Sequence, residues 1–347
     1  MPRGRKPPIP LSLVVGPTGA GKTTLINRLL ADPAFAHTAV ILNDFGTTAL
    51  TAAVVDRAED DILALGSGCV CCSVRGALTD GLERLLRAVD NGRIQKIGRV
   101  LIEAAEAADP AAVAAAVLAH PYLSLRFAFD GIVAVLGSDA AEALATRADV
   151  VRQVAIADVV ALAGSPAIAI PNATALLVDA ANAPPGVFTG HGPFAPETGD
   201  PATWLGASNP ARCAGLAGEA ARVRCFRVAR DATMPIADLE RFLEYLVTLR
   251  GPSLIRLRAV VGTGSADVVV AESYGAFFLP SALIGGGEGA GAPHGLRFDL
   301  VARDFDEAAF SAYLDAFLGE PRVDMPDRQA LTANPLTIAG FSARRGR

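Results

Sequence analysis

One stretch near the N-terminus limits the possible folds more than any other part of the chain. Residues 11–15, "LSLVV", form a short apolar run typical of a buried strand, and "GPTGAGKTT" follows at once before the helical pattern "LINRLLADP". The spacing from Gly16 to Lys22 and Thr23 matches the P-loop pattern, in which glycines let successive backbone N–H groups face one anion. The stretch therefore predicts a strand, a phosphate-binding loop and a helix in that order.

Two side chains of this loop have separate roles in the P-loop pattern. Lys22 would reach the β- and γ-phosphates of a nucleotide, and the Thr23 hydroxyl would ligate magnesium. A glycine-rich turn that merely joins a strand to a helix is the structural alternative. The predicted nucleotide-binding residues are Gly16, Gly19, Ala20, Gly21, Lys22, Thr23 and Thr24.

Further apolar runs, separated by helical lengths, indicate a mainly parallel sheet. These runs are "TAVILND" (38–44), "RVLIE" (99–103), "GIVAVL" (131–136) and "DVVALAG" (158–164). In open α/β sheets ligands gather at the carboxyl ends of the strands, where Asp44 and Glu103 lie in this sequence. We therefore expect these two acids at a magnesium-phosphate group, and the predicted catalytic residues are Lys22, Thr23, Asp44 and Glu103.

The composition excludes several classes of protein. With 347 residues, 51% of them apolar, the chain is long enough for two domains with real cores. A net charge of -5 provides no basic field for nucleic acid. The longest apolar stretches are interrupted before the roughly 18 to 20 residues that a membrane span needs. We expect a cytoplasmic protein with neither nucleic acid nor a membrane as partner.

The stretch "LGSGCVCCSVRG" (65–76) contains three of the five cysteines of the chain. A disulfide framework is a poor explanation, because the total is odd and the other two, Cys213 and Cys225, lie far downstream. The C-x-x-C motif of a thiol oxidoreductase in a thioredoxin-like context is absent. A soft metal remains as the functional interpretation, and buried structural cysteines or a vicinal disulfide remain as the alternative.

The combination of "GPTGAGKTT", "NDFG" and "GCVCCSVRG" resembles the CobW-like family of metallochaperone GTPases, relatives of the urease and hydrogenase nickel-insertion GTPases. The resemblance implies an α/β P-loop NTPase domain with a mainly parallel sheet, followed by a smaller α+β C-terminal domain. The limits that it implies are a disordered basic tail over 1–10, a nucleotide-binding domain with the CxCC motif over 11–183, a linker over 184–221, a CobW-like C-terminal domain over 222–320 and a tail over 321–347.

The same resemblance implies the activity. The chain would bind and hydrolyse GTP or another nucleoside triphosphate with Mg²⁺, and would couple this to delivery of a metal to a client metalloprotein. Cys69, Cys71 and Cys72 would be the thiolates that hold Zn²⁺ or another thiophilic divalent metal. Three thiolates leave one tetrahedral position open, for water, a client residue or Asp44, and an open site suits a carrier. A homodimer is left open.

The resemblance also assigns the moving segments. Residues 43–46 would belong to the first switch, and residues 101–110 would form the Walker-B-like strand and the second switch. The cysteine motif lies between them in sequence. After the linker, we expect a small α+β layer with helices near 237–249 and 306–318 and strands near 222–230, 254–262, 267–275 and 296–303. It would contact a client or report the nucleotide state, and a passive cap is the alternative.

The sequence departs from the family at the base-recognition motif. The family reads guanine through N-K-x-D, whose aspartate accepts two hydrogen bonds from the base, but here residues 163–166 are "AGSP". Each charge-assisted bond lost is worth about 1.5 to 3 kcal/mol. We therefore expect weak discrimination between guanine and adenine, unless Asn172 or Asp179 supplies an acceptor.

A second departure lies in the second switch, where Glu106 replaces the glycine whose backbone N–H contacts the γ-phosphate. Unless its side chain points outward, Glu106 would place a negative charge near a negative phosphate and weaken triphosphate sensing or hydrolysis. Ser67 and Thr47 replace an asparagine and a glutamate of the family pattern. These changes favour a rival hypothesis, a non-hydrolysing sensor of nucleotide and metal. A small-molecule kinase would leave the cysteines unexplained.

Overall fold

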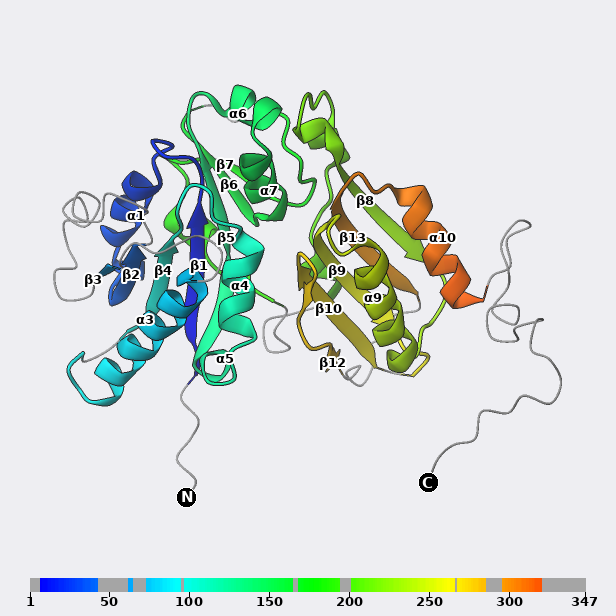
Figure 1. Ribbon diagram of the computed structural model, residues 1–347, viewed down its shortest axis with the longest axis horizontal. Coiled ribbons are helices and arrows are strands. Elements are labelled where there is room, and N and C mark those ends of the chain that lie inside the picture. Colours follow the sequence, from blue (N-terminus) through cyan, green and yellow to red (C-terminus); the bar gives the residue numbers. More distant parts are fainter. Residues whose placement is uncertain are drawn as a thin grey trace, which may run out of the picture.

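A seven-stranded sheet organises the N-terminal half of the chain (Figure 1). The computed structural model describes residues 7–42, 62–64, 73–94, 97–164, 168–193, 201–265, 267–284 and 295–319. The strands are β1 Ile9–Val15, β2 Thr38–Leu42, β3 Ile62–Ala64, β4 Arg99–Glu103, β5 Phe127–Leu136, β6 Val159–Leu162 and β7 Leu176–Asp179. Their order is β3-β2-β4-β1-β5-β6-β7, and each neighbouring pair is parallel. The predicted parallel sheet is confirmed.

Helices cover both faces of this sheet. They are α1 Lys22–Leu30, α3 Ser73–Asp90, α4 Pro110–Leu118, α5 Leu123–Arg126, α6 Ala140–Thr146 and α7 Ala148–Ile156. Side chains of β1 alternate between the two cores: Leu11 and Leu13 pack with α3, α4 and α7, whereas Val14 packs with α1. Burial on both faces explains why these strands are continuous apolar runs rather than alternating ones.

Pairing between neighbouring strands moves some predicted boundaries. The strand expected at 131–136 begins already at Phe127, and β1 begins at Ile9, inside the predicted basic tail, because these two residues pair with each other. The run expected over 158–164 is a strand only over Val159–Leu162, and Gly164 has left the strand with a φ of 106°. Strand β7 was not predicted, since its four residues are only partly buried and show no strand periodicity.

A second sheet follows, and its pairs are antiparallel. Its strands are β8 Val223–Arg230, β9 Leu254–Gly262, β10 Val268–Tyr274, β11 Phe277–Phe278, β12 Ala282–Ile284 and β13 Leu296–Arg303. Helices α9 Ile236–Arg250 and α10 Glu307–Leu318 lie on one face of the sheet (Figure 1). Phe242 of α9 packs on Phe298 and Phe310 with ring centroids 5.7 and 5.6 Å away. The expected α+β layer is confirmed.

Short helical segments complete the described chain. They are the 3₁₀ helices η1 Pro33–Phe35, η2 Pro185–Phe188, η4 Pro210–Cys213 and η5 Ala220–Arg222, and the α-helix α8 Pro201–Leu205. Four of these five lie in the segment that joins the two sheets. Within the described ranges, none of the helices combines the length and the apolar character needed to cross a membrane.

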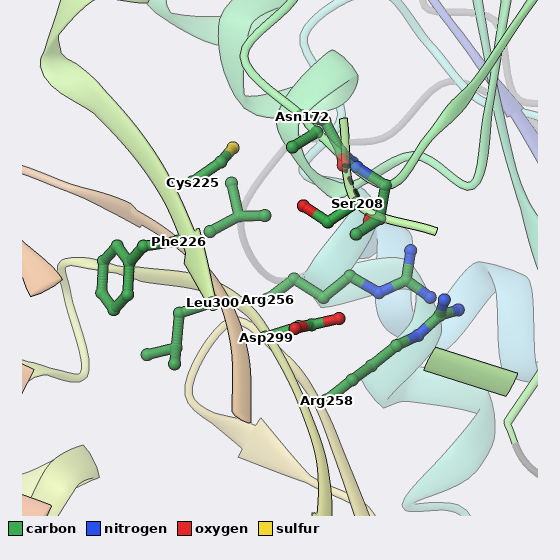
Figure 2. Close-up of a pocket in the computed structure, with 11 residues that line it drawn as sticks. Asn172, Ser208, Cys225, Phe226, Arg256, Arg258, Asp299 and Leu300 are labelled. Atoms are coloured by element: carbon green, nitrogen blue, oxygen red, sulfur yellow. Dashed lines mark hydrogen bonds between the residues drawn. The ribbon is translucent and has the colours of Figure 1, made fainter. Parts of the chain in front are cut away.

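The two sheets meet through a buried cluster of charges. Arg256 and Arg258 extend side by side from β9 (Figure 2). Both contact Asp158, which directly precedes β6 of the first sheet, at 2.8 and 2.7 Å. Both also contact Glu272 of β10, at 2.7 and 3.0 Å. Tyr274 adds an edge-on contact to a phenylalanine of β5, with ring centroids 5.2 Å apart. The second sheet is thus joined to the first by paired charges and apolar packing.

Candidate functional site

The loop after β1 has the backbone that the sequence motif requires. Gly16 adopts a φ of 144°, and a Cβ built there would lie 2.2 Å from the carbonyl oxygen of Val135, so a larger residue cannot fit. Gly21 precedes α1 in the left-handed region, with a φ of 98°. Helix α1 then starts at Lys22, so its N-terminal N–H groups end in the loop. Such a helix start attracts an anion.

Lys22 lies folded over the loop. Its side chain is buried, and Nζ donates hydrogen bonds to the carbonyl oxygens of Gly16, at 2.8 Å, and Pro17, at 3.0 Å. An anionic ligand attracts an ammonium more strongly than neutral carbonyl oxygens do. The lysine therefore lies at the point where the motif requires a cation.

Thr23 and Glu103 contact each other although 80 residues separate them in sequence. Strand β4 lies beside β1, with Glu103 in register with Val14, so the end of β4 reaches the first turn of α1. The Thr23 hydroxyl lies 3.1 and 3.2 Å from the two carboxylate oxygens of Glu103, and Glu103 is 8% exposed. A hydroxyl beside a carboxylate is a hard oxygen donor set, which fits Mg²⁺.

Glu106 points towards the phosphate loop. Its carboxylate accepts a hydrogen bond of 2.8 Å from the Thr18 hydroxyl, and its other oxygen lies 2.5 Å from Arg147 Nη1. The hydrogen bond from Thr18, together with that from Arg147, holds the pKa of the Glu106 carboxyl below its usual value of 4.5. The sequence raised an outward-pointing side chain as one possibility, but the structure shows an inward-pointing glutamate whose charge is paired.

Asn172 and Asp179, the two candidates for an acceptor that could replace the missing base motif, lie in different surroundings. Asn172 is 0% exposed, and its amide is fully used: it donates to the carbonyl oxygens of Ala155 and Ala157 and accepts from the backbone N–H groups of residues 174 and 175. Asp179, in register with Leu162 at the carboxyl end of the sheet, accepts from Ala181 N and Asn182 Nδ2. Its pKa is lowered, because these bonds favour the carboxylate. Asn172 is thus a structural residue.

Several predicted residues lie outside the described ranges. They are Asp44 and the rest of the first switch segment 43–46, Thr47, Ser67, the three cysteines Cys69, Cys71 and Cys72, and residues 165 and 166 of the base motif. Their predicted roles stay predictions. Among the described residues, no group of three or more His, Cys, Asp and Glu side chains is arranged to hold a metal.

Sequence reasoning missed one contact at this site, that of Arg147 with Glu106. This residue precedes α7, 41 positions after Glu106, and no motif in the sequence marks it. A weak signal existed, since a glutamate in place of a glycine beside a phosphate site needs a cation to pair with it. The sequence could not show which of the many arginines supplies that charge.

Comparison with known proteins agrees with this geometry. The nucleotide-binding domain model of CobW/HypB/UreG matches residues 10–165. Zinc chaperone YjiA of Escherichia coli is 36% identical over 129 residues, which are 37% of this chain and 40% of that protein. Zinc-regulated GTPase metalloprotein activator 1 of Saccharomyces cerevisiae is 32% identical over 133 residues, 37% of this chain and 30% of that protein. The match therefore spans well under half of either relative.

A solved structure extends the likeness of the fold over most of the chain. The crystal structure of Zn(II)-bound YjiA GTPase from E. coli covers 90% of this chain and 99% of its own, with a TM-score of 0.64 and 19% identity. At that identity the likeness shows the fold, with both sheets included. For the domain built on the first sheet, three observations point to nucleotide binding: the sequence match, the backbone of the loop after β1, and the Thr23–Glu103 contact. Residues 10–165 of this chain match the nucleotide-binding domain of the CobW/HypB/UreG family.

Proposed function

We propose that this protein binds GTP with Mg²⁺, hydrolyses it, and couples the cycle to the transfer of zinc to a client protein. The observation that carries the proposal is the phosphate loop, where the start of α1, Lys22 and the Thr23–Glu103 pair converge on one end of the sheet. The domain match and the printed names of the relatives, a zinc chaperone and a zinc-regulated GTPase, support the choice of nucleotide and metal.

Nucleotide binding would use the loop as it stands. The backbone N–H groups of residues 16–24 would face the phosphates, and Lys22 would exchange its two carbonyl partners for phosphate oxygens. Thr23 and Glu103, with Asp44, would hold Mg²⁺, which supplies neutralisation of the phosphate charge when bound. Catalysis of this kind depends mainly on positioning and on charge neutralisation, so few other reacting side chains are needed.

Zinc would be the cargo, held by the thiolates of Cys69, Cys71 and Cys72. Zinc accepts thiolate sulfur in tetrahedral geometry, and three ligands leave a position through which the ion can pass to another protein. The cysteine motif directly precedes α3 and lies between β2 and β4 in sequence, the two strands that lead to the predicted switch segments. Nucleotide state and metal affinity could thus be linked within one domain.

The remaining assignments belong to the same proposal. We place the nucleotide-binding domain at 11–183, the linker at 184–221 and the second domain at 222–320, and we assign the second domain to contact with the client. A cytoplasmic setting would keep the thiols reduced and able to bind metal.

Titration of a fluorescent GTP analogue with Mg²⁺ tests the nucleotide part. Lys22→Ala should weaken binding at least tenfold, about 1.4 kcal/mol, because it removes the cation from the loop. Arg87→Ala is the matched control, since it removes one positive charge from an exposed site on α3 and should leave the affinity unchanged. Equal affinities in wild type and Lys22→Ala would refute the proposal.

A further inference from the structure

The side chain of Glu106 fills a place beside the phosphate loop that the fold would otherwise leave to an anion. Thr18 is the third residue of the loop that begins at Gly16, and its hydroxyl donates to Glu106 Oε2 at 2.8 Å. Arg147 Nη1 approaches the other oxygen at 2.5 Å. A hydroxyl and a guanidinium that converge on two oxygens of one anion form the donor set that also binds a phosphate.

Arg147 has a second carboxylate that keeps it in place. Its Nη2 and Nε lie 2.5 and 3.3 Å from the two oxygens of Asp149, two positions further along the chain. The guanidinium therefore bridges Asp149 on one side and Glu106 on the other. If Glu106 moved away, the fork to Asp149 would still orient Arg147 towards the loop.

The backbone around Glu106 is fixed independently of its side chain. Gln153 of α7, which is 1% exposed, donates from Nε2 to the carbonyl oxygens of Glu106, at 2.7 Å, and Ala108, at 3.3 Å. The side chains of Glu106 and Arg147 are about one-third exposed, at 36% and 35%. Rotation of the Glu106 side chain into solvent would thus release Thr18 and Arg147 without moving the main chain.

We propose that Arg147 binds the terminal phosphate of a bound triphosphate, and that the Glu106 carboxylate occupies this place when the terminal phosphate is absent. The γ-phosphate would exchange with the Glu106 carboxylate for Thr18 and Arg147. A nucleoside diphosphate does not extend to this position, so it would bind with the Glu106 contacts intact. The pair would therefore set the preference for triphosphate over diphosphate. This inference rests on the proposed nucleotide binding.

The test compares the affinities for GDP and for a non-hydrolysable GTP analogue, both with Mg²⁺, by isothermal titration calorimetry on the full chain. Arg147→Ala should weaken binding of the analogue about tenfold or more and change GDP binding less than twofold. Glu106→Gln should strengthen binding of the analogue several-fold, because the repelling charge is gone, and again leave GDP unchanged.

Arg152→Ala is the matched control. Arg152 lies on α7, which Arg147 directly precedes, and its Nε is 3.0 Å from the carboxylate of Asp109, three residues after Glu106. In the described contacts it touches neither Glu106 nor Thr18. This variant should leave both affinities unchanged. If Arg147→Ala does not fold, Arg147→Lys, which keeps the charge but loses the fork, should show a smaller loss confined to the analogue.

The outcomes separate the inference from the proposal beneath it. An Arg147→Ala variant that binds both nucleotides like wild type, or that weakens both equally, would show that the pair is only structural and would overturn the inference. Loss confined to the triphosphate analogue would support it. If wild type binds neither nucleotide, or Lys22→Ala binds both like wild type, the proposed function itself fails and the inference falls with it.

Discussion

Neutralising Asp158 should destabilise the protein more than any exposed charge change, because three donors depend on its carboxylate. The Asp158 side chain is 3% exposed and accepts from Ile132 N at 2.9 Å, Arg256 at 2.8 Å and Arg258 at 2.7 Å. In Asp158→Asn one acceptor oxygen becomes an NH₂ donor, so either the backbone N–H or an arginine would face a donor. Removing one partner of a buried ion pair costs about 3–5 kcal/mol. Both arginines keep Glu272, so we expect about 3 kcal/mol.

Urea unfolding followed by circular dichroism measures this loss, and Asp304→Asn is the control. Asp304 also pairs with an arginine, Arg222, but its side chain is 52% exposed, so solvent screens the pair and the loss of its charge should cost much less than that of Asp158. If Asp158→Asn stays within about 1 kcal/mol of wild type, or if the two variants lose the same free energy of unfolding, the buried ion pairs of Asp158 do not stabilise the fold as expected.

Three further predictions follow from the charges, the cysteines and the base motif. Burial raises the pKa of Asp158, but the two arginines lower it overall, so the unfolded chain binds the proton more readily than the folded chain. The difference in unfolding free energy between wild type and Asp158→Asn should therefore be constant from about pH 5 to 7 and shrink as the pH falls below the usual pKa of 3.8. Urea unfolding midpoints measured over this pH range check this. Cys69→Ser with Cys71→Ser should abolish stoichiometric zinc binding and its proton release in calorimetry, whereas undiminished zinc would assign these cysteines a structural role. Competition titration should find GTP and ATP affinities within about a hundredfold, roughly 2.7 kcal/mol; a larger preference for GTP would mean that the segment around Asp179 reads the base.

Local sequence patterns predict much of this fold because the parallel strands are buried on both faces. The run over 99–103 was predicted to the residue, since it is a short apolar segment with a charged residue at each end. The strand predicted near 254–262 has the same bounds in the structure. Sequence patterns did not predict β7, because the four residues Leu176–Asp179 show no strand alternation. In the structure this strand is paired with Val159–Leu162 of β6. Whether such an edge strand forms depends on its pairing with a neighbouring strand, which the local sequence does not show.

The site was predictable where a motif lies within consecutive residues, and less so where it depends on distant partners. Glycine spacing predicted the loop between β1 and α1, and the strand ends predicted that Glu103 lies beside it. The environment of Glu106 could not be predicted, because Arg147, 41 residues further along the chain, reaches it from the junction between α6 and α7. The sequence offered Asn172 as an acceptor for the nucleotide base. In the structure its side chain is buried and hydrogen-bonded to the backbone of four residues, so it stabilises the local backbone instead.

We propose that this chain hydrolyses GTP and that the reaction is linked to zinc. Steady-state release of inorganic phosphate from GTP with Mg²⁺, measured on wild type with and without zinc and on Lys22→Ala, tests both statements. We predict many turnovers per wild-type chain, a rate that changes when zinc is added, and release by Lys22→Ala no faster than in a protein-free blank. Wild-type phosphate release that equals that of Lys22→Ala, with or without zinc, would overturn the proposed GTP hydrolysis.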